Sequence, residues 1–343
     1  MPDEILRPRV GVVMLAYGDE PVIDQAIAAV ASSAGVEVSL VVVDNGCHRQ
    51  DLDELCRASG AALLRPARNL GFAGGVNLGA RHVDAPFLAL VNSDAVVSQD
   101  ALGRLVDVAA APGTGIASGS IRLADDPSRI NSAGNPVHVL GLSWAGGLGE
   151  PASEHATARD VASASGAGLV VRRELWERLG GFPEEFFAYQ EDLELSWRTW
   201  QLGYRVRYVP DAVVSHHYEF SRNAGKMFLL ERNRLLFVLT CYGTRALALL
   251  APALLCFEVA MLAVALAQGW ARQKVRGWFW VLGHLGWVRR RRAQVQLARA
   301  VPDADMLGLW TDHFDAAAMP LPGWAQPLQG MLAAYWRVVR RFV

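Results

Sequence analysis

The chain has 343 residues, of which 52% are hydrophobic and 20% charged, and its formal net charge is −1, so composition supports one large domain or one domain with an appendage. Its cysteines form no CxxC pair and offer neither a disulfide framework nor a zinc site, which favours a reducing compartment; they are Cys47, Cys56, Cys241 and Cys256. The N-terminal segment MPDEILRPRV carries acids and no apolar stretch, so we expect no secretory signal.

The near-neutral total charge hides an asymmetry along the chain. Residues 1–230 carry 19 Lys and Arg against 28 Asp and Glu, whereas residues 231–343 carry 14 against 6. This split predicts two parts of the protein with different partners.

The first 111 residues alternate between apolar runs and helical patterns. Short apolar runs, typical of buried parallel strands, predict strands at 10–16, 39–43, 62–65 and 87–91. Helices are predicted between and after them, at 21–32, 51–59, 72–83 and 100–111. Alternation at this spacing predicts an α/β fold, with a parallel sheet covered by helices on both faces.

Polar residues follow three of these predicted strands. They are Ala16-Tyr17, Asp44-Asn45 and Asn92-Ser93-Asp94. Ligands of such sheets bind at the carboxyl ends of the strands, so we expect Asp44 to meet a nucleotide base or ribose. Asp94 is expected to hold a divalent cation that bridges two phosphates, since Mg²⁺ commonly uses one or two carboxylates with phosphate oxygens. Taken alone, either segment also fits a plain turn.

A glycine-rich strand-to-helix junction, RNLGFAGGVN, occupies residues 68–77. It is not a GxGxxG motif after the first strand, which weakens the interpretation as a dinucleotide-binding dehydrogenase. Arg68 is expected to meet phosphate, and Asn69 and Asn77 to act as polar anchors. An ordinary glycine-rich loop remains the alternative.

Residues 115–165 are rich in Gly, Ser and Ala and predict only short strands, with a mobile loop near 145–158. Clearer strands are expected at 165–172, 205–209 and 212–216, and a helix at 174–179. One imidazole of His216-His217 is expected to complete the metal or diphosphate site, and a purely structural role of the pair is the alternative. Ser221 and Arg222 lie just beyond and are expected to contact phosphate.

The stretch GFPEEFFAYQEDLELSWR, residues 181–198, places two adjacent carboxylates between an aromatic run and a helical pattern. Glu191 and Asp192 therefore belong near a helix N-terminus, where carboxylates are favoured. Aromatic surroundings desolvate a carboxylate and raise its pKa toward the range of a general base. The same pair could instead only complement the helix dipole.

Together these segments resemble the family 2 glycosyltransferases of the GT-A fold. The resemblance runs from about Val10 to Arg234, and the combination of RNLGF, NSD and FFAYQEDLEL is most similar to the bacterial rhamnosyltransferases that act on lipid-linked or cell-wall glycans. It implies a Rossmann-like, mostly parallel sheet with flanking helices over residues 1–230. A nucleotide-sugar half would cover about 1–115 and an acceptor half about 116–230, followed by a helical, membrane-associating region at 231–343.

The resemblance also implies roles for individual residues. Asp192 would deprotonate the acceptor hydroxyl, with Glu191 as the alternative base, and Asp94 and His216 would hold Mg²⁺ or Mn²⁺. The implied nucleotide-sugar site comprises Ala16, Tyr17, Asp44, Asn45, Arg68, Asn69, Gly71, Asn77, Asn92, Ser93, Asp94 and Arg222. The implied acceptor site comprises Gly166, Ala167, Trp197 and Arg198. The chain departs from the family in having NSD in place of DxD, so only Asp94 of this motif offers a carboxylate.

The expected activity is inverting transfer of a sugar from a nucleotide sugar, with dTDP-rhamnose favoured, to a lipid-diphosphate-linked glycan. Transfer of galactofuranose or a hexose from a UDP-sugar is the alternative within the family. A sugar-phosphate nucleotidyltransferase would need a basic glycine-rich loop after the first strand, where this chain has AYGDEP. A non-catalytic membrane adaptor would tolerate loss of the carboxylates, which this chain retains. No nucleic-acid partner is expected.

The basic C-terminal part is expected to dock on the inner face of the cell membrane. It combines an apolar run at 246–267, a tryptophan-rich flank and a stretch at 268–302 without acids. The run is long enough to span a bilayer, but it contains Pro252 and Glu258, and a mid-span charge costs about 2.5–3.5 kcal/mol on insertion scales. We therefore expect these helices to lie in or against the membrane–water interface and not to span the bilayer. A helical subdomain packed on the catalytic part, or an oligomer interface, is the alternative.

Overall fold

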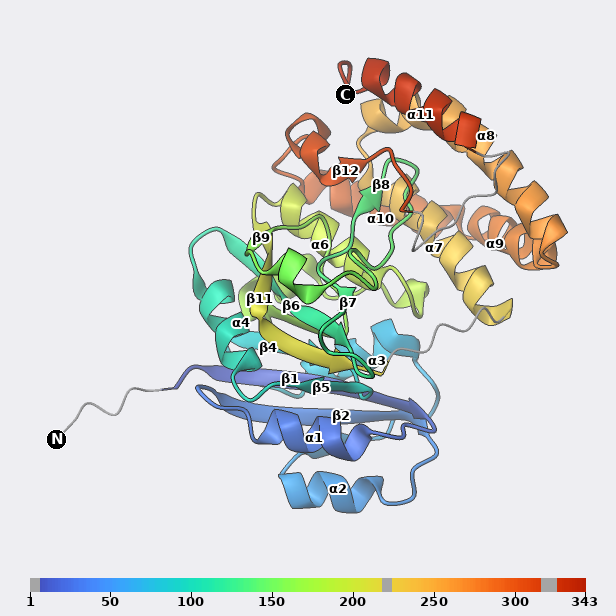
Figure 1. Cartoon of the computed structure of the whole chain (residues 1–343). Coiled ribbons are helices and arrows are strands. Elements are labelled where there is room, and N and C mark those ends of the chain that lie inside the picture. The colour runs from blue at the N-terminus through green and yellow to red at the C-terminus, as the bar shows by residue number, and fades with distance from the viewer. Residues whose placement is uncertain (1–6, 218–223, 316–325) are drawn as a thin grey trace.

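The computed structural model describes residues 7–217, 224–315 and 326–343. A 10-stranded mixed sheet forms the centre of the molecule, and its main path runs β3-β2-β1-β4-β10-β6-β11-β5. Helices cover both faces of this sheet, and further helices from the C-terminal part gather at one end of the molecule (Figure 1). The α/β fold with a mostly parallel sheet, expected from the sequence, is confirmed.

The first half of the sheet is parallel because each strand is followed by a helix that returns the chain to the same edge. The strands are β1 (Arg9–Gly18), β2 (Glu37–Cys47), β3 (Ala62–Leu64) and β4 (Phe87–Val91). The helices are α1 (Ile23–Ala31), α2 (Leu52–Ser59), α3 (Gly71–Ala80) and α4 (Ala101–Ala110). All eight lie within a few residues of the predicted ranges.

The second half of the sheet mixes directions. It consists of β10 (Gly168–Arg172), β6 (Thr114–Leu123), β11 (Arg205–His216) and β5 (Ala95–Val97). The strand β10 runs antiparallel to both β4 and β6, whereas β6 and β11 are parallel. The strands expected at 205–209 and 212–216 form the single strand β11, with a register shift between Val209 and Val213 beside Pro210.

Two apolar cores lie on opposite faces of the sheet. One packs α1, α2 and α4 against it, and the other packs α3, α5 (Arg173–Leu179) and α6 (Glu191–Gln201). Because α3 and α6 share a face, the glycine-rich junction and the acidic pair reach the same side of the sheet. The fold therefore gathers segments separated by more than 100 residues.

The C-terminal part is helical, as expected. Its helices are α7 (Ala224–Cys241), α8 (Thr244–Ala267), α9 (Ala271–Gly283), α10 (Leu285–Ala298) and α11 (Gln326–Val339). A third apolar core joins them to α6, and the short strands β8 (Val137–His138) and β12 (Trp310–Thr311) add a second link. The boundary predicted at 230 falls inside α7.

Candidate active site

Asp44 lies near the end of β2, at the carboxyl edge of the sheet, where a nucleotide was expected. Its Oδ1 accepts hydrogen bonds from the N–H groups of Gly46 at 3.2 Å and Cys47 at 2.9 Å. Its Oδ2 accepts one from Nε of Arg65 at 3.0 Å. Arg65 was not singled out in the sequence, although its position three residues before Arg68 makes this segment basic. Beside Asp44, Ala16 is buried and Tyr17 is 61% exposed.

Asn45 and Asn69 fix the glycine-rich junction. Nδ2 of Asn45 donates to Oδ1 of Asn69 at 2.8 Å and to the Gly71 carbonyl at 3.1 Å, and Oδ1 of Asn45 accepts the Leu70 N–H at 2.8 Å. Gly71 has φ +71°, and a Cβ there would lie 2.3 Å from the Phe187 carbonyl oxygen. Only glycine fits this close approach. Arg68 lies exposed at the start of the junction.

Asp94 and His216 lie close together because β5 (Ala95–Val97), which begins just after Asp94, pairs with the end of β11. Nε2 of His216 lies 3.1 Å from Oδ1 of Asp94, and Nδ1 lies 3.1 Å from Oδ1 of Asn131, which precedes Ser132 on β7 (Ile130–Ser132). When Nδ1–H donates to Asn131, the lone pair of Nε2 points toward the Asp94 carboxylate. Two electron-rich atoms then face each other, an arrangement that a cation stabilises.

Two groups near Asp94 complete this edge. The Ser93 hydroxyl donates to the Leu15 carbonyl at 2.8 Å, tying β4 to β1. Glu20 accepts the Tyr17 N–H at 2.9 Å, and burial, with a smaller contribution from Asp94, raises its pKa above the ordinary carboxyl value. Glu20 was not predicted from the sequence, where its only signal is an acid just after the first strand.

Within the described ranges 7–217, 224–315 and 326–343, no cluster of three or more His, Cys, Asp or Glu side chains could hold a metal ion. Asp94 and His216 nevertheless fit a divalent cation that also binds phosphate oxygens, because one or two protein carboxylates are common for Mg²⁺ in such sites. Asn131 supplies the partner that commonly orients a metal-binding imidazole.

Asp192 occupies the first turn of α6, with Glu191 directly before it. Oδ2 of Asp192 accepts the Gly166 N–H at 3.0 Å and Oδ1 accepts the Leu193 N–H at 2.8 Å. The next residue, Ala167, accepts the Asn92 N–H at 3.3 Å. The segment 166–167 thus joins Asp192 to the end of β4, two residues before Asp94.

The two acidic neighbours differ in environment. Asp192 is half-buried, and burial raises its pKa above the ordinary carboxyl value although two N–H groups favour its charged form. Glu191 is buried, and its Oε2 has no hydrogen-bond partner among the described residues. Burial first, and the charge of Asp192 second, raise the pKa of Glu191 well above its ordinary value. Asp192 is therefore the accessible member of the pair.

The structure corrects the acceptor-site prediction for Trp197 and Arg198. Trp197 is 0% exposed and packs against Phe237, Tyr242 and Trp310. Arg198 is also buried, with its guanidinium donating to the carbonyls of Leu179 at 2.5 Å and Gly181 at 2.9 Å. Neither side chain reaches an acceptor, because the C-terminal helices cover this face of α6.

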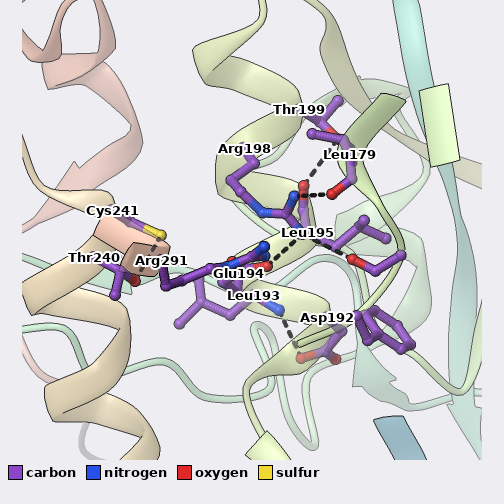
Figure 2. A network of polar contacts seen from close by, with 12 residues as sticks. Leu179, Asp192, Leu193, Glu194, Leu195, Arg198, Thr199, Thr240, Cys241 and Arg291 are labelled. Carbon is purple, nitrogen blue, oxygen red and sulfur yellow. Dashed lines mark hydrogen bonds and ion pairs between the residues drawn. The ribbon is translucent and has the colours of Figure 1, made fainter. Parts of the chain in front are cut away.

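Arg198 belongs to a buried ionic network at the same junction. Figure 2 shows Glu194 between Arg198 and Arg291, with carboxylate-to-guanidinium distances of 2.7 and 2.6 Å. Arg291 comes from α10, so the helix that begins with the acidic pair is tied to the C-terminal part. Glu194 and Arg198 are spaced i, i+4 on α6, so they lie on the same face of this helix.

Asn77 also differs from the expected nucleotide contact. Its side-chain amide is buried and exchanges two hydrogen bonds with the backbone of Phe182, at 2.8 and 3.0 Å. Asn77 thereby anchors the segment that leads to the acidic pair and does not face the strand ends. Arg222 lies outside the described residues.

Comparison with known proteins identifies the family. A family model described as "Glycosyltransferase like family 2" matches residues 8–235, which is more than half of the chain. The chain belongs to the family 2 glycosyltransferases. The matched range of this glycosyltransferase ends inside α7 and includes the strand ends, the glycine-rich junction and the acidic pair.

Curated relatives point to glycan assembly. An N-acetylglucosaminyl-diphospho-decaprenol L-rhamnosyltransferase of Mycobacterium tuberculosis is 29% identical over 238 residues, covering 60% of this glycosyltransferase and 75% of that protein. An O-antigen biosynthesis protein of Myxococcus xanthus is 30% identical over 156 residues, which are 43% of this chain and 12% of that protein.

Solved structures share the fold. A mannosyltransferase of Pyrobaculum calidifontis, in complex with GDP-Man and Mn²⁺, superposes with a TM-score of 0.53 at 21% identity and covers 87% of this glycosyltransferase and 88% of that chain. Residues 1–349 of TarS from S. aureus give a TM-score of 0.55 at 14% identity, with 97% and 90% covered. These likenesses confirm the GT-A fold.

Proposed function

We propose that this glycosyltransferase moves one sugar, L-rhamnose from dTDP-rhamnose, to a hydroxyl of a lipid-diphosphate-linked glycan in cell-wall or surface polysaccharide assembly. The mycobacterial relative is named for L-rhamnosyl transfer to such an acceptor. The carboxylates that the reaction needs, Asp94 and Asp192, lie on the same edge of this sheet.

The link between Asp192 and the end of β4 carries the proposal. Ala167 contacts Asn92 and Gly166 contacts Asp192, so the base stands beside the expected donor site. Asp192 takes the proton of the acceptor hydroxyl as its oxygen attacks the anomeric carbon, and the bond to the diphosphate breaks. A single displacement with one base inverts the anomeric configuration.

Asp94 and His216 would hold a divalent cation, Mg²⁺ or Mn²⁺, with Asn131 orienting the imidazole. When bound, the cation neutralises the charge that develops on the leaving diphosphate. Asp44, near the end of β2, and Arg65, which directly follows β3 and contacts Asp44, would bind the nucleoside. Arg68, at the glycine-rich junction, would contact the diphosphate.

A donor panel tests this proposal. Purified protein is incubated with a polyprenyl-diphosphate-linked N-acetylglucosamine acceptor and dTDP-rhamnose, UDP-galactofuranose or a UDP-hexose, each with Mg²⁺ or Mn²⁺. We expect transfer from dTDP-rhamnose, with the anomeric configuration of the product, read by NMR, opposite to that of the donor. If only a UDP-sugar supports transfer, the donor is that UDP-sugar and not dTDP-rhamnose. Absence of any transfer would reject the proposal.

We further propose that α8, α9 and α11 dock on an anionic membrane at its cytoplasmic face, where a lipid-linked acceptor is held. The helix α8 is long and apolar enough to span a bilayer, with a mean hydropathy of 2.3 in its most apolar window, of which 6% is buried. A core helix of this composition would be covered by protein. Its exposed side chains include Leu255 and Val259, at 68% and 71%.

Exposed apolar and basic side chains also occur on α9, on α11 and just after α11. The apolar ones are Phe279, Leu282, Met331, Val338 and Phe342. The basic ones are Arg272, Arg276, Arg337, Arg340 and Arg341. Apolar groups with interspersed cations are typical of helices that lie in the headgroup region of anionic bilayers.

Glu258 does not oppose this docking, because its charge is paired inside the protein. Its carboxylate contacts the Arg234 guanidinium of α7 and lies 3.0 Å from Nζ of Lys274 of α9. Nε1 of Trp278 donates to it at 2.5 Å. One side of α8 is thus fixed to α7 and α9 by ions, which leaves the side that carries Leu255 and Val259 for lipid and favours peripheral docking over a span.

A further inference from the structure

The helix α7 carries four consecutive polar residues, Glu231 to Arg234, that are all buried. Glu231 and Arg234 belong to the ionic cluster beneath α8. Arg232 and Asn233 take no part in this cluster. Buried polar side chains of this kind need partners, and both find them in the segment 185–190 that leads to the acidic pair.

Asn233 is 0% exposed and binds this segment by its amide. Its Nδ2 donates to the carbonyl oxygens of Phe186 at 2.9 Å, Ala188 at 2.8 Å and Tyr189 at 2.7 Å. One side-chain amide thus contacts three carbonyl oxygens of this segment.

Arg232 extends the contact by one residue. Its Nη2 donates to the Glu185 carbonyl at 2.7 Å and the Phe186 carbonyl at 2.8 Å, and its Nε donates to Oδ1 of Asn233 at 3.0 Å. The guanidinium also stacks over the Trp280 ring of α9, 4.6 Å from the ring centroid. The orientation of Asn233 is thus fixed by Arg232, which is itself held from the C-terminal helices.

The backbone that these side chains hold is strained. Phe187, Tyr189 and Gln190 have φ of 62°, 71° and 67°. The left-handed region costs a non-glycine residue about 1–2 kcal/mol. The Ala188 N–H also donates to the Phe186 carbonyl at 2.7 Å, and Phe187 has ψ −64°, which makes a γ-turn of the rare, strained form. Such backbone persists only where its surroundings compensate the strain.

This strained segment sets the direction of the acidic pair. Gln190 is the N-cap of α6, so its backbone determines where Glu191 and Asp192 leave the loop. On its other side, the Phe187 carbonyl accepts the Ala73 N–H of α3 at 3.0 Å. The segment 185–190 therefore lies between the glycine-rich junction and α7, and its conformation depends on both.

We propose that Asn233 and Arg232 are positioning residues for sugar transfer, which hold residues 185–190 in the conformation that aims Asp192 at the acceptor hydroxyl. The proposal rests on the proposed function of Asp192 as base. It also gives the C-terminal part a role in catalysis, because α7 reaches from the docking helices to the loop that ends at the acidic pair.

Replacement of Asn233 by alanine tests the proposal. We expect Asn233→Ala to lower kcat 10- to 100-fold, since a misplacement of about 1 Å costs on this order, while the calorimetric Kd for the nucleotide donor changes less than about twofold. Hydrogen exchange measured by mass spectrometry should rise in the peptide 183–193 and stay unchanged in β1 and β2. The milder Arg232→Lys keeps the charge, loses the planar fork and should give a smaller loss of the same kind.

Gln201→Ala is the matched control. This buried side-chain amide donates to the Cys241 carbonyl at 2.6 Å across the same α6–α7 junction but does not touch 185–190. It should lower the melting temperature with kcat unchanged. Equal kcat losses in Asn233→Ala and Gln201→Ala, or unchanged exchange in 183–193, would overturn the proposal. Wild-type protein that fails to transfer would reject the proposed function, and exchange in 183–193, which needs no activity, would still test whether Asn233 holds this segment.

Discussion

His216, at the end of β11, and Asp94, directly before β5, face each other, with Nε2 of the imidazole 3.1 Å from Oδ1 of the carboxylate. The far nitrogen of the ring is held by Asn131 at 3.1 Å. The pair comes from segments 122 residues apart, and each member lies at a position where the sequence alone indicated a ligand. This arrangement leads to the first prediction.

Asp94→Ala should remove most of the gain in nucleotide affinity that Mg²⁺ or Mn²⁺ provides, because the carboxylate is the only charged protein ligand proposed. Asn131→Ala should reduce metal affinity about 10- to 100-fold by releasing the orientation of His216. Calorimetric titration of the nucleoside diphosphate with and without metal measures both. If Asp94→Ala shows the same metal-dependent gain as wild type, Asp94 does not bind the cation.

Asp192→Asn should lower transfer about 10²- to 10⁴-fold, the usual contribution of a general base. The amide keeps the size of the side chain and can still accept the Gly166 N–H, so donor affinity should stay near that of wild type. In the wild-type enzyme, the raised pKa of Asp192 places the acid limb of kcat/KM above pH 4, the ordinary range of an aspartate. Wild-type turnover in Asp192→Asn would transfer the role of base to Glu191.

Glu191 should make the stability of the protein depend on pH. Its pKa is raised in the folded state, so the folded protein holds a proton that the unfolded chain releases above about pH 4.3. The stability that the protonated Glu191 contributes to the folded state is fully present below that pH. It is lost as the pH rises through the pKa of Glu191 in the folded protein. Glu191→Gln should therefore gain stability over wild type as pH rises from 4 to 8, measured by urea unfolding. If the difference in free energy of unfolding between Glu191→Gln and wild type stays constant with pH, Glu191 is not protonated in the folded protein.

Val259→Glu should weaken binding to anionic vesicles without lowering the free energy of unfolding by more than about 0.5 kcal/mol, because the side chain is exposed. Ala58→Glu, which adds the same charge to the exposed face of α2 at the other end of the molecule (Figure 1), is the control. Flotation followed by a high-salt wash is the measurement. Equal flotation of both variants, or a dimer in light scattering that Val259→Glu dissociates, would assign α8 to a protein interface.

The sequence predicted the first half of the sheet well because its strands are runs of branched apolar residues. It failed at β6, the strand between β10 and β11, because that strand contains Gly115, Ser118, Gly119 and Ser120. A Cβ at Gly119 would lie 3.1 Å from the Ala212 carbonyl oxygen and 3.2 Å from that of Gly168. Close packing there requires small residues, and these carry no periodic signal.

The sequence predicted the candidate site residues whose positions depend on the neighbouring strand or helix. It did not predict the burial of residues that distant segments cover. Asp94, His216 and Asp192 follow strands or begin a helix, so their positions could be read from the elements around them. Trp197 and Arg198 lie on the correct helix, but α7 and α10 cover that face from 40 or more residues away. Their burial is a property of the tertiary packing, which no local pattern reports.

The core shared by α6 and the C-terminal helices limits how this enzyme can be recombined with its relatives. That core includes Val137, Phe186 and Trp197 from the sugar-transfer part together with Phe237 and Trp336 from the C-terminal part. A chimera cut at residue 230 would divide α7 and leave Trp197 against a foreign surface. An exchange of the C-terminal part with that of a relative would therefore have to carry residues 137–140 and 185–197 along to keep this core intact.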